Sequence, residues 1–577
     1  MAIIGIDLGT TNSLVSVFKD GQVQLIPNAF GEYLTPSIVS FGDNDEVFVG
    51  KIAKEMQITN PSRTFAEFKR NMGTNHLYNV GIRSYRAEEL SAFVLRRLKE
   101  DAEKFLGESV TEAIISVPAY FDDDKRCATK NAGLLAGLKV DRLVNEPSAV
   151  ALKHHCNSDE DETFIIFDFG GGTLDVSLVE AFDNMVEIQA VAGDNHLGGK
   201  DFNEVIANDF YKKQNLMPKL LSDADRGIVL KEAELLKQEL SHTNKASRQL
   251  RIGDKEYIME MSNQELIHLS ADLFKRMSEP IRKVINDVTI DWDDVSKIIL
   301  VGGSSKMPIV RQYIKSLSDI EVVTDENPDE SIALGVGIAA GIKERTGEIK
   351  DMILADICPF SLGIGIKDGI FSPIIERNTT LPCKASHRYV TVSDYQTSLV
   401  FDVYQGENLV AADNLRLCTL ELNDLPAAPA GEIGATVTFM YDINGILDIH
   451  IEVEGRGLRE GKSLHKVIVN KGNTLSGPEI EAHLARLRQM TLHPSEQEEN
   501  RLLIERAQRL YTECNPQLRP AIVNALAHFK EALNSKKGRP IREEYVRFSI
   551  FLSSIEENSF EFEDFDESFW TDIEDNE

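Results

Sequence analysis

The sequence has few cysteines, and none of them form a closely spaced pair. Six cysteines stand at positions 127, 156, 358, 383, 418 and 514 of a 577-residue chain. Disulfide-rich secreted domains and cysteine zinc sites both need paired or clustered cysteines, so this spacing argues against both classes. Isolated thiols are typical of a reducing compartment, and we therefore expect a cytoplasmic protein.

Long apolar runs and an excess of positive charge are also missing. No run reaches the roughly 18 to 20 apolar residues that a membrane helix needs. The first residues already read as a strand, so no signal peptide is expected. The chain has 62 Lys and Arg against 93 Asp and Glu, a formal net charge of −31. Because phosphate backbones and anionic lipids would repel such a chain, we expect neither nucleic acid nor membrane as a partner.

The sequence contains neither a complete P-loop nor a dinucleotide fingerprint in its proper context, although these are the two commonest glycine motifs that bind nucleotides. The P-loop pattern fails around Lys200, because Asp194 replaces its first glycine and Asp201 replaces its hydroxyl residue. Gly335 and Gly337 have the spacing of a dinucleotide fingerprint, but they lie in the helix-like run "SIALGVGIAAGI". That motif belongs at a strand-to-helix turn, so we interpret these glycines as sites of close helix packing.

The patterning divides the chain into several parts, as its length leads us to expect. Residues 1–350 alternate β-branched runs such as "FIIFDFG" with helical stretches such as "AEELSAFVLRRLKEDAEKFL", which predicts α/β units. Residues 351–356 form a linker whose apolar island, Met352 to Ala355, has acidic neighbours. This island fits either a buried strand or a switch between domains.

The second half of the chain changes its period. Residues 357–475 alternate with period two and carry Asn444-Gly445, a strong hairpin signal, so we predict a β-sandwich. Residues 476–555 are predicted to be helical and begin with a capping box at Ser476. Residues 556–577 contain eleven acids, no base and several aromatic residues, which predicts an acidic tail.

One local pattern occurs twice in the α/β part. A strand, an acid and a turn of small residues make up both "GIDLGTTNS" at 5–13 and "DFGGGTLD" at 168–175. Glycine-rich turns expose backbone N–H groups that cradle phosphate, and the acids can hold Mg²⁺. Two such turns that face each other would clamp one nucleotide triphosphate, and "LVGGSSKMP" at 300–308 adds a third. The alternative is that they are only tight connections between strands.

These residues resemble the actin, hexokinase and chaperone ATPase superfamily, and most closely the heat shock protein 70, or DnaK-type, chaperones. The motifs "NEPSAVAL", "GDNHLGGKDF", "NPDESIALG", "RNTTLP" and "YQGEN" follow in family order up to about residue 475. "FSPIIERNTT" and "DICPFSLG" are similar to the specialised bacterial branch typified by HscC. The resemblance implies an α/β actin-like (ribonuclease H-like) two-lobed ATPase domain, followed by an all-β sandwich and a short α-helical lid.

The resemblance also implies a set of catalytic residues. Asp7 and Asp168 correspond to acids that hold Mg²⁺ through water, and Lys69 to the lysine that positions the attacking water. Glu146 and Asp175 correspond to acids that assist metal, K⁺ or water placement. Judged from the sequence alone, Lys69 fits a solvated base on a helix face equally well. The implied contacts to nucleotide are Gly9, Thr10, Thr11, Asn12, Gly170, Gly171, Gly172, Thr173 (also catalytic), Gly198, Gly199, Glu234, Lys237, Ser241, Gly302, Gly303, Ser304, Lys306 and Asp329.

A peptide site and a relay between the two sites follow from the same resemblance. Pro118, Arg126 and Asp356 correspond to residues that relay the nucleotide state to the linker. Alternating apolar residues are more often sandwich core, and Lys367 departs from the family at the arch over the peptide. The implied pocket residues are Ile364, Tyr389, Val392, Leu399 and Phe401.

The implied function is an ATP-dependent chaperone for unfolded polypeptides, active in protein folding and the stress response. ATP, Mg²⁺ and K⁺ are the implied cofactors, and a J-domain co-chaperone is the implied partner. The segment from Ser241 to Ser262 is short, so an exchange factor of the GrpE type is either unnecessary or replaced. A small-molecule kinase and an actin-like filament former share the phosphate turns, but neither explains the sandwich.

Overall fold

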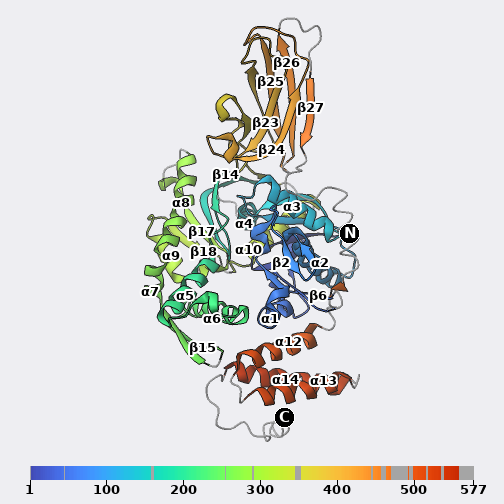
Figure 1. The fold of residues 1–577 in the computed structure, drawn as a ribbon, viewed down its shortest axis with the longest axis vertical. Helices are drawn as coiled ribbons and strands as arrows, with labels where there is room; N and C mark the ends of the chain where they lie inside the picture. The colour runs from blue at the N-terminus through green and yellow to red at the C-terminus, as the bar shows by residue number, and fades with distance from the viewer. Residues whose placement is uncertain are drawn as a thin grey trace.

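The chain folds into a two-lobed α/β body with a β-sandwich at one end and a helical bundle at the opposite end (Figure 1). These parts follow one another along the sequence. The computed structural model describes residues 2–43, 46–156, 161–253, 255–288, 292–325, 327–344, 352–443, 446–455, 463–468, 491–492, 498–514, 518–534 and 538–557.

The first lobe is built on a sheet of strand order β11-β10-β1-β2-β3. β1 pairs antiparallel with β2 and parallel with β10, and β10 pairs parallel with β11. The sheet strands are β1 (Ile3–Asp7), β2 (Asn12–Lys19), β3 (Gln22–Ile26), β10 (Glu112–Val117) and β11 (Lys139–Asn145), with β4 (Thr35–Pro36) paired to β2. The helices are α1 (Lys51–Thr59), α2 (Ala87–Leu106), α3 (Asp123–Leu135) and α4 (Glu146–His155). The short elements are β5 (Ile38–Phe41), β6 (Glu46–Val49), β7 (Thr64–Ala66), β8 (Tyr78–Val80), β9 (Arg83–Tyr85), β28 (Thr491–Leu492) and the 3-10 helices η1 (Pro61–Arg63) and η2 (Phe68–Asn71).

The second lobe repeats this plan with the strand order β18-β17-β12-β13-β14-β19. β12 pairs antiparallel with β13 and parallel with β17, which pairs parallel with β18. The strands are β12 (Glu162–Phe169), β13 (Leu174–Phe182), β14 (Met185–Asp194), β17 (Lys297–Val301), β18 (Glu321–Thr324) and the hairpin β15 (Lys245–Ile252) with β16 (Lys255–Ser262). The helices are α5 (Gly199–Lys213), α6 (Asp223–Glu239), α7 (Asn263–Leu269), α8 (Ala271–Asp287), α9 (Pro308–Lys315) and α10 (Ser331–Glu344).

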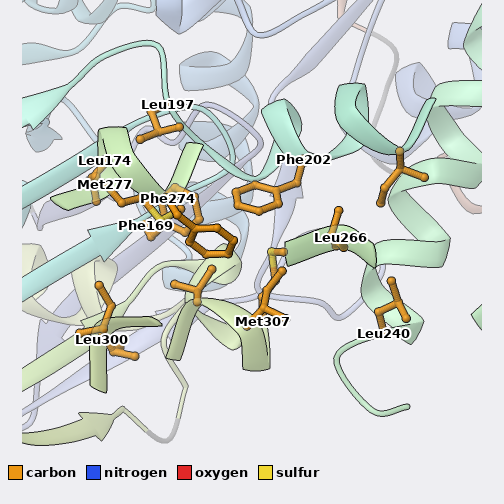
Figure 2. Close-up of a cluster of buried hydrophobic side chains, with 14 of the residues drawn as sticks. Phe169, Leu174, Leu197, Phe202, Leu240, Leu266, Phe274, Met277, Leu300 and Met307 are labelled. Carbon is orange, nitrogen blue, oxygen red and sulfur yellow. The ribbon is translucent and has the colours of Figure 1, made fainter. Parts of the chain in front are cut away.

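Buried aromatic and aliphatic side chains hold the second lobe together. Figure 2 shows Phe169 from β12, Phe202 from α5 and Phe274 from α8 gathered in one cluster. The rings of Phe169 and Phe202 pack edge to face, with their centroids 6.2 Å apart, and the centroids of the Phe202 and Phe274 rings are 5.7 Å apart in the same arrangement. The strand that leads into the glycine turn is therefore packed directly against the two helices that cover the sheet.

Helix α10 confirms the interpretation of Gly335 and Gly337 as packing sites. A Cβ atom on Gly335 would lie 1.8 Å from the carbonyl oxygen of Ala149 in α4. A Cβ on Gly337 would lie 2.6 Å from Oγ of Ser16 in β2. The absence of side chains thus lets α10 approach the first lobe closely, as the helical pattern predicted.

The sandwich consists of two four-stranded sheets, β21-β20-β23-β24 and β22-β25-β26-β27, with one apolar core between them. β25 and β26 pair antiparallel as the hairpin signal predicted, whereas the turn residues 444–445 lie outside the described residues. The strands are β20 (Leu362–Gly365), β21 (Phe371–Ile375), β22 (Cys383–Val390), β23 (Leu399–Gln405), β24 (Leu415–Leu422), β25 (Ile433–Tyr441), β26 (Leu447–Gly455) and β27 (Ser463–Ile468).

The apolar island before the sandwich forms β19 (Ile353–Ala355), an edge strand on the second lobe. It pairs parallel with β14, and in this pairing Ile353 lies opposite Met185. Met352 and Leu354 pack against buried residues of the body, while Ile353 is 57% exposed. The island is therefore half-buried at an open sheet edge.

Of the residues that the structure describes, three helices form the bundle at the far end, with a shared apolar core. The predicted capping box at Ser476 and most of the acidic tail lie outside the described residues. Within the ranges that the structure describes, no helix has the length and apolar character to cross a bilayer. The bundle helices are α12 (Glu498–Glu513), α13 (Arg519–Asn534) and α14 (Gly538–Glu557).

We predict that Gly335→Ala destabilises the body, because its new Cβ would overlap the backbone of α4. Overpacking of this kind costs about 1–3 kcal/mol. Gly227→Ala is the matched control, since Gly227 lies in α6 and a Cβ there would meet no other atom within 4 Å. Urea unfolding should show a lower midpoint for Gly335→Ala and an unchanged or higher midpoint for Gly227→Ala. Equal midpoints for the two variants would contradict the packing role.

Candidate functional site

A cavity of about 710 Å³ lies between the two lobes and takes its lining from both. It brings together most of the residues that the sequence singled out. Gly172, Asp175, Gly198 and Gly199 are not among its lining residues. The predicted residues that do line it are Asp7, Gly9, Thr10, Thr11, Asn12, Lys69, Glu146, Asp168, Gly170, Gly171, Thr173, Glu234, Lys237, Ser241, Gly302, Gly303, Ser304, Lys306 and Asp329.

The two repeated turns occupy equivalent places in the lobes and touch each other. One joins β1 to β2 and the other joins β12 to β13. A Cβ on Gly171 would lie 2.0 Å from Thr11 Oγ1, and a Cβ on Gly172 would lie 2.8 Å from Thr10 Cγ2. Thr11 Oγ1 is buried and has no hydrogen-bond partner within the described part of the chain. The turns therefore form one concavity with a spare hydroxyl group, which suits the oxygens of a phosphate chain.

The first residues of α5 support the second turn from behind. The N–H groups of Gly199 and Lys200 donate to the carbonyl oxygens of Gly170 and Gly171, both at 3.0 Å. A Cβ on Gly198 would lie only 2.4 Å from the backbone nitrogen of Gly172. Gly198 and Gly199 thus position the turn.

Four buried carboxylates surround one buried base at the cavity: Asp7, Glu146 and Asp168 line it together with Lys69, and Asp175 lies behind the lining. Lys69 Nζ donates to Glu146 Oε1 at 2.7 Å, and both side chains are 6% exposed. Burial, reinforced by the charge of Glu146, raises the pKa of Asp7 to about 7 and that of Asp175 to about 7. The same two causes raise the pKa of Asp168 well above its usual range. A divalent cation would offset this excess of negative charge, and carboxylate oxygens suit Mg²⁺.

Lys69 is not the solvated base that the sequence alone allowed. It lies in the short helix η2 and is 5% exposed. Burial works against its charge, but the carboxylates of Glu146 and Asp7 outweigh this and raise the pKa of its ammonium group. Lys69 therefore carries a fixed positive charge into the cavity.

The other end of the cavity lies between α6 and the turn after β17. Lys237 Nζ donates to the carbonyl oxygen of Gly199 at 2.8 Å, and burial lowers the pKa of Lys237 to about 8. Gly302 has a φ of 80°, and a Cβ there would lie 2.6 Å from the carbonyl oxygen of Phe169. Lys306 forms an ion pair with Asp329 at the edge of the cavity. This end of the cavity is lined by residues of α6 and of the turn after β17, outside the two phosphate turns.

The family profile described as Hsp70 protein matches residues 3–542. The chain belongs to the Hsp70 family. Hsp70 proteins are ATP-dependent chaperones: they hydrolyse ATP with Mg²⁺, bind unfolded polypeptides and work with J-domain co-chaperones. The two turns, the buried acids and the sandwich of this Hsp70 fall within the matched region.

Several cavity-lining residues of this Hsp70 escaped the sequence analysis. Lys200 and Asn203 lie one turn apart on α5. Met307 lies just before α9, and Arg311 lies on it. Helical periodicity could have paired these residues, but it does not tell which face meets the other lobe. The lining residues without a predicted role are Leu14, Leu34, Lys200, Asn203, His242, Met307, Arg311, Pro328 and Ile332. Gln238, which the resemblance places where some relatives stack an arginine on the adenine, also lines the cavity.

The residues predicted to bind peptide occupy different depths in the sandwich. Ile364, Leu399 and Phe401 are buried in the core between the two sheets. Tyr389 is half-buried, with its ring centroid 6.2 Å from that of Phe401, and Val392 is 59% exposed. The structure therefore places three of the five in the sandwich core and one at the surface.

The predicted relay residues lie close together between the cavity and the linker. Arg126 Nη2 donates to Asn145 Oδ1 at 2.5 Å, and Asn145 Nδ2 donates to Asp356 Oδ1 at 2.7 Å. Ser148 Oγ donates to the other oxygen of Asp356 at 3.2 Å. The carbonyl oxygen of Pro118 accepts from the N–H of Phe121 at 3.1 Å, next to this chain of contacts.

We predict that Gly171→Ala weakens nucleotide binding by forcing the two turns apart. A strain of about 1.4 kcal/mol is equivalent to a tenfold change in affinity, so the Kd for MgADP should rise about tenfold or more. Titration calorimetry with MgADP measures this change, and Gly227→Ala again serves as the control. An unaltered Kd would show that the contact between the turns does not shape the site.

Proposed function

We propose that this Hsp70 hydrolyses ATP in the cavity between its lobes and uses that step to bind and release extended apolar segments of unfolded polypeptides in its sandwich. One observation carries the proposal, namely the continuous contact from the buried lysine of the cavity to the linker. Glu146 holds Lys69, and the preceding residue Asn145 holds Asp356. A change at Lys69 can therefore reach the linker through two adjacent residues of one turn.

The repeated strand plan supports an actin-like assignment for the body. Each lobe has three antiparallel strands followed by two parallel ones, and each places its glycine turn between the first two. Kinases of the same superfamily would share this plan. A kinase would not need a β-sandwich that is joined to the second lobe through an edge strand, so a chaperone explains the whole chain better than a kinase does.

Hydrolysis requires the chain to supply position and charge. Mg²⁺, when bound through Asp7 and Asp168, would offset the charge of the phosphate oxygens. Lys69 supplies a fixed positive charge, and the turns supply backbone N–H groups. The roles of Glu146 and Asp175 in placing metal, K⁺ or water, and the catalytic role of Thr173, stay predictions. Preorganised charge of this kind is the main source of rate enhancement in phosphoryl transfer.

Contacts between the sandwich and both lobes support mechanical coupling. Gln405 accepts from the N–H of Asp123 at 3.0 Å, and the hydroxyl of Tyr441 donates to Asp123 Oδ1 at 2.5 Å. Arg377 forms an ion pair with Asp287 of the second lobe. A shift of one lobe relative to the other must therefore strain or break a contact with the sandwich.

Several finer features stay predictions. They include a place in the HscC-like branch, a cytoplasmic location and a role in the stress response. The family resemblance also implies J-domain contacts at Tyr120, Arg142 and Asn145. Asn145 belongs to the relay, and the ring centroid of Tyr120 lies 4.6 Å from that of Phe360. The hairpin β15–β16 is short, which supports an exchange step that does not need a GrpE-type factor.

We predict that Lys69→Ala leaves ATP bound but lowers its hydrolysis. Loss of one preorganised charge typically lowers the rate about 100-fold or more. Single-turnover hydrolysis and labelled-nucleotide binding measure the two effects separately. Lys125→Ala is the control. The ammonium groups of Lys69 and Lys125 lie 5.8 Å and 5.7 Å from the centre of the Phe121 ring, but Lys125 does not line the cavity. Unchanged hydrolysis in Lys69→Ala would remove the proposed role.

We also predict that Leu354→Asp uncouples the sandwich from the ATPase. A charge on the buried side of β19 should prevent this strand from joining β14. Peptide stimulation of ATP hydrolysis should then fall below about twofold, against the fivefold or more typical of allosteric coupling. Ile353→Asp is the matched control, because this neighbour points to solvent and should retain stimulation. Stimulation that survives in Leu354→Asp would reject the linker as the switch.

A further inference from the structure

The helical bundle touches both lobes at the outer edge of the nucleotide cavity. We propose that it acts as a clasp that holds the lobes together and so sets the rate at which nucleotide leaves. The inference rests on the proposed function, because it requires a nucleotide in the cavity. It adds a control of exchange that is built into the chain itself.

On the first lobe, α12 packs against α1 and its neighbours. Leu502 contacts the buried cluster of Phe48, Ile52 and Met56. The guanidinium of Arg501 lies 4.9 Å from the centre of the Phe48 ring. A cation over an aromatic face and an apolar side chain beside it make a firm attachment.

On the second lobe, α12 is held by an ion pair with α6. Lys231 Nζ lies 2.7 Å and 2.9 Å from the two oxygens of Glu513. Arg509 connects this pair to the first lobe, since it contacts Glu513 at 2.7 Å and also pairs with Glu55 of α1. The row Glu55, Arg509, Glu513 and Lys231, which we call the clasp, thus runs from one lobe to the other.

The clasp shares a helix with the nucleotide cavity. Lys231 lies on α6 about one turn before the cavity residue Glu234 and about two turns before the cavity residue Lys237. In addition, Ile58 at the end of α1 belongs to the same buried cluster as Ile228 of α6. Figure 1 shows the bundle directly beyond α1 and α6. Movement of α6 away from α1 would therefore open the cavity and strain the clasp at once.

Charge and burial make this row a barrier to opening. The side chains of Arg509 and Glu513 are 10% and 16% exposed, and that of Lys231 is 29% exposed. Separating the lobes must break either Lys231–Glu513 or Arg509–Glu55, which leaves a partly buried charge without its partner. The pairs Arg70–Asp201 and Lys200–Glu67 also join the lobes, but without the bundle. Undocking the bundle removes the clasp and leaves these inner pairs in place.

The test uses the full chain loaded with fluorescently labelled ADP and chased with unlabelled ADP. Lys231→Glu and Glu513→Lys each place like charges together and should speed release about three- to tenfold. The double variant Lys231→Glu with Glu513→Lys restores an opposite pair between α6 and α12 but leaves Arg509 beside a lysine, so it should reverse the faster release of the single variants in part. Lys245→Glu is the control, because Lys245 pairs with Glu260 at 3.0 Å within the second lobe alone, and release should not change.

Each outcome separates the clasp from the proposed function. Release rates of both single variants equal to that of the original chain would overturn the clasp, even though labelled ADP binds. Faster release that the double variant fails to reverse would also overturn it, because the effect would then come from general loss of structure. If the original chain binds no labelled ADP, the proposed function is wrong and the clasp with it.

Discussion

The ion pair between Lys69 and Glu146 is the interaction on which the rest of the site depends. Burial raises the pKa values of Asp7, Asp168 and Asp175, and the positive charge of Lys69 opposes this rise in all three. Without Lys69, the repulsion between these acids and Glu146 would lose the positive charge that offsets it. Burial makes such a pair strongly dependent on both partners, since removing one leaves an uncompensated charge. Glu146 is also the first residue of α4, so its position is coupled to Asn145 and through it to the linker.

A two-lobed body has a particular mechanical consequence. Each lobe has its own sheet and its own large buried cluster, while a third cluster is shared between them, so a relative movement of the lobes would pivot about that shared cluster. An apolar cluster that includes α4, α10 and strands of both sheets joins the lobes on one side. Around the cavity the contacts are polar: the touching turns, the inner ion pairs and the row of charges on α12. The sandwich and the bundle attach at opposite ends of this body, and each contacts both lobes from its own side.

Much of the local structure could be predicted from the sequence. The stretch from Ala87 to Leu106 is one helix with the predicted bounds, and "SIALGVGIAAGI" is helical as its pattern indicated. The period-two pattern predicted for 357–475 is present in β23, where Leu399, Phe401 and Val403 are buried. Lys69 could not be placed in this way, because nothing near it in the sequence shows that Glu146 lies 2.7 Å away. Arg509 is a similar case, since its partner Glu55 is distant in the sequence.

The sequence by itself determined the elements, the glycine turns and the acids that follow each strand, because periodicity and backbone sterics act over a few residues. The tertiary structure alone decided which turns meet, which lysine is buried and which charges join the lobes. It also decided that the apolar island before the sandwich lies at a sheet edge with Ile353 in solvent. These features depend on contacts between residues far apart in the chain, and such contacts form only when several separately folded parts pack together.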